Sequence, residues 1–328
     1  MGDVPPIELL NKVRPVALAA IKQGSATHSQ HARDLKSLMS SAQSKADDWF
    51  APVQCSYPGC SKNSIKNSHS IQAAALRKSL GNQLYSPIWS RGEYALNVGL
   101  ISAKNASLFP GYCVTHEDAF EFENAILLST PRDDALQIMR VLHREAWLVE
   151  SRRVIADLVC TLIHKIFSLS TELNFLTQEQ GKDLRAVLDA CEAYVRLQER
   201  MQIRLMPTLR RVEAFVLSKS EVSPDWLFVK DLDDQGFSFI STITLETKLA
   251  PLISITLLPN DGNSRVIATI EVDFDGFLPS YVSQYLSRET IASTLRKFLE
   301  DGTLDWYASE CWWDSLAPQE RARIESSL

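Results

Sequence analysis

The feature that most constrains the fold is a set of two Cys/His pairs in the first third of the chain. Cys55 and Cys60 are separated by four residues, and Cys113 and His116 by two. A Pro-Gly turn signal lies within the first pair and another just before the second. Thiolates and imidazoles in two such pairs are the ligands of tetrahedral zinc sites. The spacing predicts one zinc ion that joins two distant turns, with buried or free thiols as the alternative.

Composition places the chain among globular proteins. It has 328 residues, of which 45% are hydrophobic and 23% charged, which allows two or three domains. Three further cysteines, Cys160, Cys191 and Cys311, stand alone among apolar neighbours, and we expect them to pack as small hydrophobic side chains. No secretory signal opens the sequence and no window approaches the apolar run of a membrane helix, so we expect a cytoplasmic protein without a membrane partner.

Charge is unevenly distributed along the chain. The net charge is −6. Residues 1–120 hold 12 Lys/Arg and 8 Asp/Glu, a balance of +4, whereas residues 220–328 hold 8 and 18, a balance of −10. The Cys/His segment therefore lies in the positive part of an acidic protein, which permits a partner with a phosphate backbone there.

Apolar periodicity predicts an α+β fold in four parts. Residues 1–50 have the spacing of helices, and residues 51–131 read as a compact zinc-stapled module with short strands and turns. Residues 132–219 are rich in helix formers and predict a long helical hairpin. Residues 220–328 alternate as strands and end in helix, which predicts a C-terminal domain with an antiparallel sheet.

Local signals mark several ends and turns. Thr177 and Gln180 form a capping box before a long helix, which Pro207 is expected to kink or end. The sequence NDGN at 260–263 predicts a hairpin. Ser287 is the expected cap of a helix near the C-terminus. Trp306, with three further aromatic residues close behind it, is expected to seal a core.

His69 is the candidate catalytic residue of the Cys/His segment. It lies nine residues after Cys60, where the flanking isoleucines suggest a short strand. A histidine in that place can act as general base and activate a water that attacks phosphorus. The alternative is a histidine that makes a structural hydrogen bond or contributes to zinc.

The segment from about residue 50 to 150 resembles a known family. Cys-x4-Cys, a strand with a histidine, an asparagine, and a Cys/His knuckle that leads into a helix are similar to zinc-containing HNH endonucleases of the His-Me finger class. The wording SHSIQ, FPGYCVTHE and IMRVLHREAW also resembles a group of mostly uncharacterised bacterial proteins with an HNH-like module. The resemblance implies a treble-clef, or ββα-metal, module.

The resemblance also implies roles for single residues. His69 matches the general base, and Asn105 matches the middle asparagine that orients the base or braces the loop. Glu117 matches the last position, where the family binds a catalytic cation, here Mg²⁺ or another divalent ion, with Asp118 as the alternative. Ser68 departs from the pattern, because the family has Asp or His before its base to complete the shell of the cation.

Two functions follow from these patterns. The first is a metal-dependent endonuclease that acts on nucleic acid, DNA rather than RNA, with a role in bacterial defence against phage by analogy. The phosphates would be held by five basic side chains: Lys62, Lys66, Arg77, Lys78 and Lys104. The second is a non-catalytic interaction or sensor protein that zinc stabilises. In either case the helical or C-terminal part would bind a protein partner or a second copy of the chain.

One more segment allows two interpretations. The sequence HREAWLVESRR places His143, Glu150 and several arginines on a helix within the hairpin of residues 132–219. These side chains could reach a bound phosphate. The alternative is the solvated face of an amphipathic helix with pairs of opposite charge three or four residues apart.

Overall fold

The computed structural model describes most of the chain. It covers residues 6–26, 30–47, 51–89, 96–120, 128–232, 239–245, 251–260, 263–285 and 306–327. These residues form two compact units, each built from two separated stretches of sequence. Unit 1 comprises residues 1–51 and 147–203, and unit 2 comprises residues 52–146 and 204–328. The elements are helical in unit 1 and mixed in unit 2, so the fold is α+β, as predicted.

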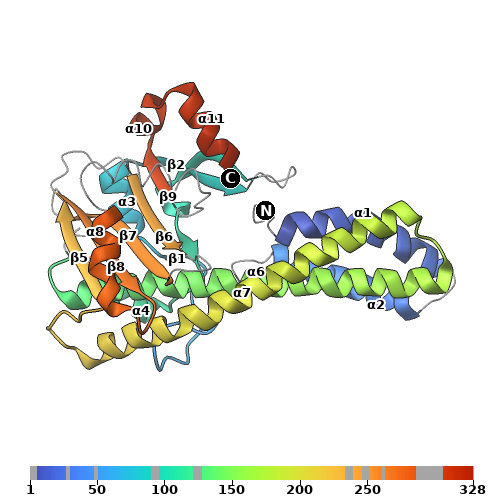
Figure 1. Ribbon diagram of the computed structural model, residues 1–328, viewed down its shortest axis with the longest axis horizontal. Coiled ribbons are helices and arrows are strands. Elements are labelled where there is room, and N and C mark those ends of the chain that lie inside the picture. Colours follow the sequence, from blue (N-terminus) through green and yellow to red (C-terminus); the bar gives the residue numbers. More distant parts are fainter. Residues whose placement is uncertain are drawn as a thin grey trace. The chain divides into compact units, whose positions relative to one another are not determined.

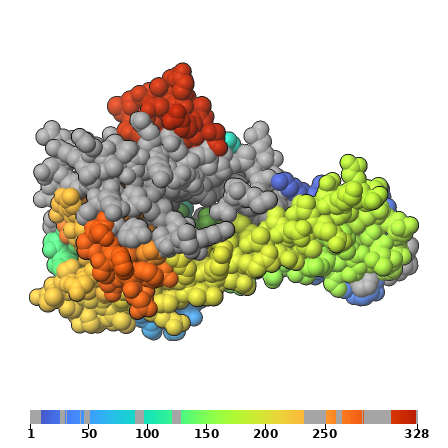
Figure 2. Space-filling view, in the orientation of Figure 1, coloured from blue at the N-terminus to red at the C-terminus, as the bar shows by residue number. Residues whose placement is uncertain are grey.

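Unit 1 is a bundle of helices. Its elements are α1 (Pro6–Ala26), α2 (Gln30–Asp47) and parts of α6 (Pro131–Leu173) and α7 (Gln178–Ser218). All four contribute to one apolar core that includes Leu35, Ile163 and Cys191. Figure 1 shows the four helices side by side, and in Figure 2 the near face of this unit is formed largely by α6 and α7. The core forms because each helix repeats apolar residues every three or four positions.

The two long helices begin at well-formed caps. The hydroxyl of Thr130 accepts a hydrogen bond from the Asp133 amide at 3.1 Å, and the Asp133 carboxylate accepts one from the Thr130 amide at 3.0 Å. At the start of α7, Thr177 and Gln180 exchange the same two bonds at 3.1 and 3.2 Å. The capping box and the long helical hairpin are thus confirmed. Pro207 lies inside α7, which continues to Ser218.

Helix α6 corrects one expectation from the sequence. It contains an 18-residue window with a mean hydropathy of 1.5, so among the described helices it alone has the length and composition of a membrane span. Of that window, 44% is buried inside the protein. Core helices of soluble proteins share these properties, and much of α6 lies in the apolar core of unit 1.

Unit 2 contains a sheet of seven described strands in the order β3-β2-β9-β6-β7-β8-β5. Every pairing in it is antiparallel. Its strands are β2 (Gln83–Trp89), β3 (Leu96–Ser102), β5 (Leu227–Leu232), β6 (Phe239–Leu245), β7 (Ile253–Asn260), β8 (Asn263–Ile270) and β9 (Trp306–Ser309). The expected hairpin is present, because Asn260 pairs with Asn263. The sheet joins β2 and β3 to strands more than a hundred residues later.

Aromatic side chains seal the core of this sheet. Trp306 is fully buried and Trp313 is 3% exposed, and their rings stack with centroids 5.8 Å apart. The ring of Tyr85, on β2, stacks on Trp313 with centroids 5.3 Å apart.

The helices of this region are α8 (Leu278–Tyr285), α10 (Glu310–Ser315) and α11 (Pro318–Ser327), with the 3₁₀ turn η3 (Asp275–Phe277).

The remaining elements of unit 2 surround the Cys/His segment. They are β1 (Ser68–His69), α3 (Ala73–Leu80), η1 (Ala103–Asn105), β4 (Leu108–Phe109), α4 (Val114–Glu117) and η2 (Asp118–Phe120). The strands β1 and β4 form a second, two-stranded antiparallel sheet.

The expectation for the lone cysteines is confirmed for two of the three. Cys160 and Cys191 are buried, but Cys311 is exposed, because it lies on the outer side of the short helix α10 whose buried residue is Trp313. The helix that Ser287 was expected to cap falls outside the described residues.

Candidate metal centre

The first Cys pair lies on a tight turn. Gly59 adopts a left-handed φ of 77°, and the amide of Cys60 donates to the carbonyl of Tyr57 at 3.0 Å. A residue with a side chain would be strained at that φ, so the Pro-Gly sequence explains the bend. The amide of Cys55 donates to the carbonyl of Lys62 at 2.8 Å, which closes the loop behind the turn.

The second pair is placed by a close backbone approach at Gly111. A Cβ atom there would lie 2.3 Å from the ring of Phe109, so only glycine fits. The carbonyl of Gly111 accepts from the amide of Ser56 at 2.7 Å, which ties the second turn to the first. Cys113 then begins α4 as its N-cap residue, and His116 lies on the first turn of that helix.

The four predicted ligands converge. Their ligand atoms all lie within 4.8 Å of one another. His116 Nδ1 is 3.4 Å from the sulfurs of both Cys55 and Cys113, and the sulfurs of Cys60 and Cys113 are 4.0 Å apart. Ligands at about 2.3 Å (S) and 2.1 Å (N) from a tetrahedral zinc would lie roughly 3.6–3.8 Å apart. The cluster therefore has the composition and the dimensions to hold a structural zinc ion, as the spacing predicted.

Two contacts around the cluster suit a metal, whereas the burial of one ligand opposes it. Burial raises the pKa of the Cys55 thiol to about 11, which disfavours the thiolate that a metal would bind. The ring of Tyr57 stacks on His116 with centroids 4.1 Å apart and fixes the orientation of the imidazole. The amide of Cys113 donates to the sulfur of Cys55 at 3.3 Å, a contact that stabilises a thiolate.

His69 lies on β1, beside the metal cluster in sequence and in the fold. Its backbone pairs with Leu108 of β4, and its Nδ1 lies 2.9 Å from the carbonyl oxygen of Ala106. Since a carbonyl only accepts, Nδ1 carries the proton and Nε2 carries the lone pair. Nε2 makes no hydrogen bond within the described part of the chain.

Burial sets the charge of His69. It lowers the pKa of the imidazole from 6.5 to about 4, the carbonyl of Ala106 opposes this effect in part, and the positive charge of Arg140 adds to it. The side chain is only partly exposed. At neutral pH the imidazole is therefore neutral, and its Nε2 can accept a proton.

Ser107 braces this histidine, and sequence reasoning missed it. Its hydroxyl donates to the carbonyl of Ile71 at 2.7 Å and lies 3.4 Å from His69 Nδ1, while its carbonyl accepts from the amide of Ser70 at 2.9 Å. Ser107 has a φ of 55°, which a tight connection between η1 and β4 requires. The only sign of this role in the sequence was that Ser107 lies two residues after Asn105, the residue that the resemblance assigns to bracing the loop.

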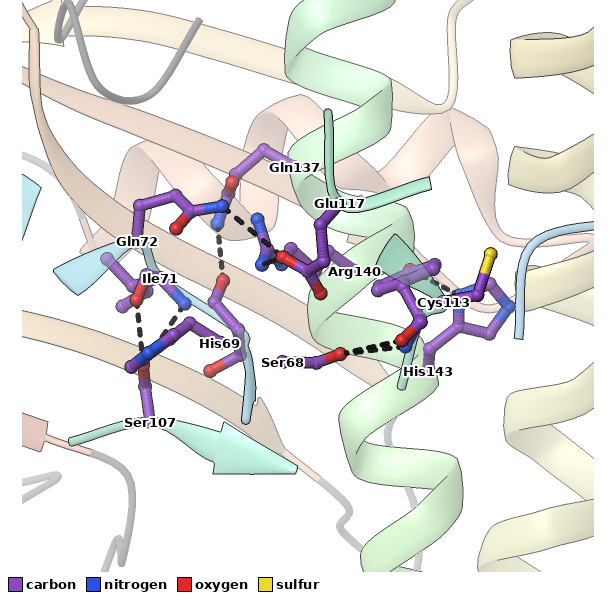
Figure 3. A network of polar contacts seen from close by, with 12 residues as sticks. Ser68, His69, Ile71, Gln72, Ser107, Cys113, Glu117, Gln137, Arg140 and His143 are labelled. Atoms are coloured by element: carbon purple, nitrogen blue, oxygen red, sulfur yellow. Dashed lines mark hydrogen bonds and ion pairs between the residues drawn. The ribbon is translucent and has the colours of Figure 1, made fainter. Parts of the chain in front are cut away.

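Glu117 points into a buried polar network (Figure 3). Its Oε2 accepts from Arg140 Nη2 at 2.8 Å, and the Arg140 side chain is fully buried. Gln72 lies against the same pair. Its Nε2 lies 3.5 Å from Glu117 Oε2, a contact marked by a dashed line in Figure 3, but that orientation also sets the amide nitrogen against guanidinium N–H groups. Rotating the amide by 180° places its oxygen 3.0 and 3.2 Å from Nη1 and Nη2 of Arg140.

The other residues near the predicted catalytic position are not gathered around Glu117. Ser68 is fully buried, and its hydroxyl accepts from the Tyr112 amide at 2.8 Å and donates to the Tyr112 carbonyl at 3.3 Å. Asn105 and Asp118 are exposed, and Asn105 makes no side-chain hydrogen bond within the described residues. Ser107, rather than Asn105, thus makes the bracing contacts that the structure describes.

The five basic residues proposed for nucleic acid are all exposed and belong to unit 2. Lys62 donates to the hydroxyl of Thr115 on α4 at 3.2 Å, and Arg77 and Lys78 lie in the last turn of α3. Lys104 is in η1, next to the loop that holds His69. The set is completed by Lys66, two residues before β1.

The residues of the HREAWLVESRR segment divide between the two interpretations. His143 is buried, with Nδ1 2.7 Å from the hydroxyl of Tyr112 and Nε2 2.8 Å from a carboxylate oxygen of Glu213. Glu150 and Arg153 form a partly exposed pair on the surface of α6. His143 therefore joins α6 to both the knuckle and α7, and Glu150 belongs to the solvated face.

Comparisons with known proteins do not identify a family for this chain, so its function is inferred from its own residues. No protein-family description matches the chain, and searches of curated proteins and of solved structures found no match.

Proposed function

We propose that this protein is a nucleic-acid endonuclease built on a zinc-stapled module of the HNH, or His-Me finger, type. One observation carries the proposal: Nδ1 of His69 is fixed by the carbonyl of Ala106, which leaves the lone pair of Nε2 for a reacting water. The short antiparallel pair of β1 and β4, followed by α4 with a ligand of the Cys3His cluster on it, is the order of elements that a treble-clef finger has.

The reaction would be hydrolysis of a phosphodiester. Nε2 of His69 takes a proton from a water, the oxygen of that water bonds to phosphorus, and the bond from phosphorus to one ester oxygen breaks. The leaving oxygen takes a proton from solvent. Burial keeps the imidazole neutral at physiological pH, and its pKa of about 4 makes it a weaker base than an ordinary histidine, so the role rests on the position of Nε2 rather than on its basicity.

The divalent cation that the resemblance implies does not fit the residues present. The hydroxyl of Ser68 accepts a hydrogen bond from the amide of Tyr112 and donates one to its carbonyl, and Glu117 is paired with Arg140. We therefore route no step through Mg²⁺. The zinc ion, by contrast, fits its four ligands and would hold the scaffold of His69 together.

Substrate binding would use the exposed basic side chains of unit 2. Lys66 lies just before β1, the strand that carries His69, and Lys104 lies just before β4, the strand that pairs with β1. Arg77 and Lys78 lie on α3, the helix that follows β1. Contacts of this kind bind the phosphate backbone without reading sequence. The preference for DNA over RNA and the role in phage defence remain predictions from the resemblance.

The test is cleavage by the purified, zinc-loaded full chain. Plasmid DNA and a structured RNA would each be incubated with and without Mg²⁺ or Mn²⁺, beside His69→Ala and a matched control, His164→Ala, which changes an exposed histidine on α6. Cleavage by the wild type and the control but not by His69→Ala supports the proposal. Cleavage that survives in His69→Ala, or absence of cleavage under every condition, counts against it.

A second function is favoured by a different observation. The ion pair between Glu117 and the fully buried Arg140 is a good structural contact and leaves the cation position of an HNH site filled by protein. A zinc-stabilised interaction or sensor protein needs no reacting water at His69. If every cleavage assay is negative while zinc is bound, this reading replaces the nuclease.

A further inference from the structure

The most unusual feature beside the candidate site is a buried positive charge. The side chain of Arg140 on α6 is fully buried, and it donates to Glu117 Oε2 at 2.8 Å. Its guanidinium carbon lies 4.2 Å from the centre of the Phe120 ring and 5.8 Å from that of Tyr112. A guanidinium is positively charged and stacks on aromatic rings, so the network contains a buried cation.

This charge lies where the resemblance would put a metal ion. Glu117 is the residue that matches the last, cation-binding position, and its carboxylate is neutralised by the guanidinium. The oxygen of Gln72 faces the same guanidinium at 3.0 and 3.2 Å. Oxygen atoms of a carboxylate and an amide, which would be ligands for Mg²⁺ or Mn²⁺, are thus turned toward Arg140.

The charge is also close enough to act on His69. Arg140 is among the groups that lower the pKa of the imidazole, next to the larger effect of burial. Gln137, one turn before Arg140 on α6, donates to the carbonyl of Ser70, the residue after His69, at 3.0 Å. The helix segment that carries the guanidinium is therefore fixed to the residue that follows the strand of the imidazole.

We propose that the guanidinium of Arg140 takes the place of the divalent cation in this site, so that the wild-type protein excludes Mg²⁺ and Mn²⁺ from Glu117. In one respect this proposal rests on the proposed nuclease function: it implies that hydrolysis at His69 would need no divalent cation besides the structural zinc ion. Arg140 acts as a positioning residue, because its buried side chain supplies a fixed charge and holds Glu117 without touching the reacting atoms.

Removal of the guanidinium should convert the network into a cation site. In Arg140→Met, the carboxylate of Glu117 loses its counter-ion. The amide oxygen of Gln72 loses its donors, and Oε1 of Gln137 is a further buried oxygen that has no hydrogen bond. A carboxylate and neutral oxygens form the set of ligands that hard divalent cations prefer. Arg140→Lys keeps the charge and should behave as the wild type.

The measurement is binding of Mn²⁺ to the zinc-loaded full chain, followed by electron paramagnetic resonance and by the shift of the melting temperature. With 1 mM MnCl₂ we expect no specific site in the wild type or in Arg140→Lys. For Arg140→Met we expect one bound Mn²⁺ and a rise of roughly 5 °C or more. Zinc content is measured before and after, so that exchange in the Cys3His cluster is detected.

A double variant guards against loss of folding. Arg140→Met takes the counter-ion away from the partly buried carboxylate of Glu117 and is expected to be less stable without Mn²⁺, whereas Arg140→Met with Glu117→Gln removes both charges. The double variant should therefore fold and bind no Mn²⁺. If Arg140→Met folds only when Mn²⁺ is present during refolding, that dependence itself supports the proposal.

Two results would overturn the proposal. One is a Mn²⁺ site in the wild type that disappears in Glu117→Gln. The other is absence of Mn²⁺ binding in every variant, which would make the pair a structural contact and nothing more. Cleavage assays answer a separate question: activity that requires added Mg²⁺ contradicts the substitution by Arg140, while absence of all activity contradicts the nuclease and leaves the Mn²⁺ measurement to decide.

Discussion

Nδ1 of His69 lies 2.9 Å from the main-chain oxygen of Ala106, two residues before β4, the strand that pairs with β1. The contact fixes both the orientation of the ring and its tautomer, because the carbonyl requires a proton on Nδ1. Burial of the ring lowers its pKa to about 4. Together these two effects produce a neutral imidazole whose Nε2 is unprotonated over the whole physiological range.

The first prediction concerns stability in acid. Between about pH 6.5 and pH 4 the unfolded chain protonates His69 and the folded protein does not, so lowering the pH through this window favours unfolding. The full difference corresponds to roughly 3 kcal/mol at pH 4. Above about pH 7.5 the histidine is neutral in both states and contributes no pH dependence. Urea unfolding at several pH values measures the slope.

His69→Gln is the control for that slope. The variant keeps all four metal ligands, so acid affects its zinc site as it affects the wild type. The difference in unfolding free energy between the two proteins should therefore change with pH in the stated window and be constant above it. A difference that is the same at pH 7.5 and pH 4.5 would show that His69 titrates normally.

The second prediction concerns Ser107. Ser107→Ala removes the hydroxyl that donates to Ile71 and lies beside His69. We expect a loss of about 1–2 kcal/mol in unfolding free energy and, if the protein is a nuclease, a reduced kcat with little change in KM. Ser280→Ala, which removes an exposed hydroxyl bonded to Phe277, should change neither. An NMR titration of the imidazole that is identical in wild type and Ser107→Ala would argue against the bracing role.

The third prediction concerns the metal cluster. Cys113→Ser should lower bound zinc from one equivalent to well below half, because serine is a much weaker ligand, and unfold the segment that the two turns hold together. Cys311→Ser changes an exposed thiol outside the cluster and should keep one equivalent. Zinc is measured by elemental analysis and folding by circular dichroism. A wild-type protein that carries no zinc after preparation in zinc-containing buffer would contradict the site.

The fourth prediction concerns the cap of α7. Thr177→Ala removes the acceptor for the amide of Gln180 and should cost about 1 kcal/mol of stability. Thr171→Ala is a matched control, because the Thr171 hydroxyl is exposed and only donates back to the carbonyl of Phe167 within α6. That change should be neutral or slightly stabilising. Equal losses in the two variants would show that the capping box contributes nothing.

Local signals in the sequence predicted the local structure well. The capping box at Thr177, the Pro-Gly turn before Cys60 and the pairing of Asn260 with Asn263 all depend on residues a few positions apart. Each is set by the conformational limits of glycine and proline or by a hydrogen bond within one turn. These are properties that the chain carries wherever it folds.

Contacts between distant segments were not predictable in the same way. The pairing of Tyr85 with Ala308, which joins β2 to β9, has no sequence signal because strand partners are chosen by the packing of whole faces. The pair of Glu117 with Arg140 is hidden for a related reason. An arginine within an amphipathic helix reads as solvated until the neighbouring rings of Phe120 and Tyr112 are in place to bury it.

The sequence by itself determined the long helical hairpin and the two ligand pairs, Cys55 with Cys60 and Cys113 with His116, because periodicity and the spacing within each pair are encoded in neighbouring residues. Only the tertiary structure decided what surrounds His69. Its pKa, its partner Ala106 and the buried charge of Arg140 all depend on which segments exclude water from the ring. Desolvation is a property of the packed molecule, so no stretch of sequence contains it.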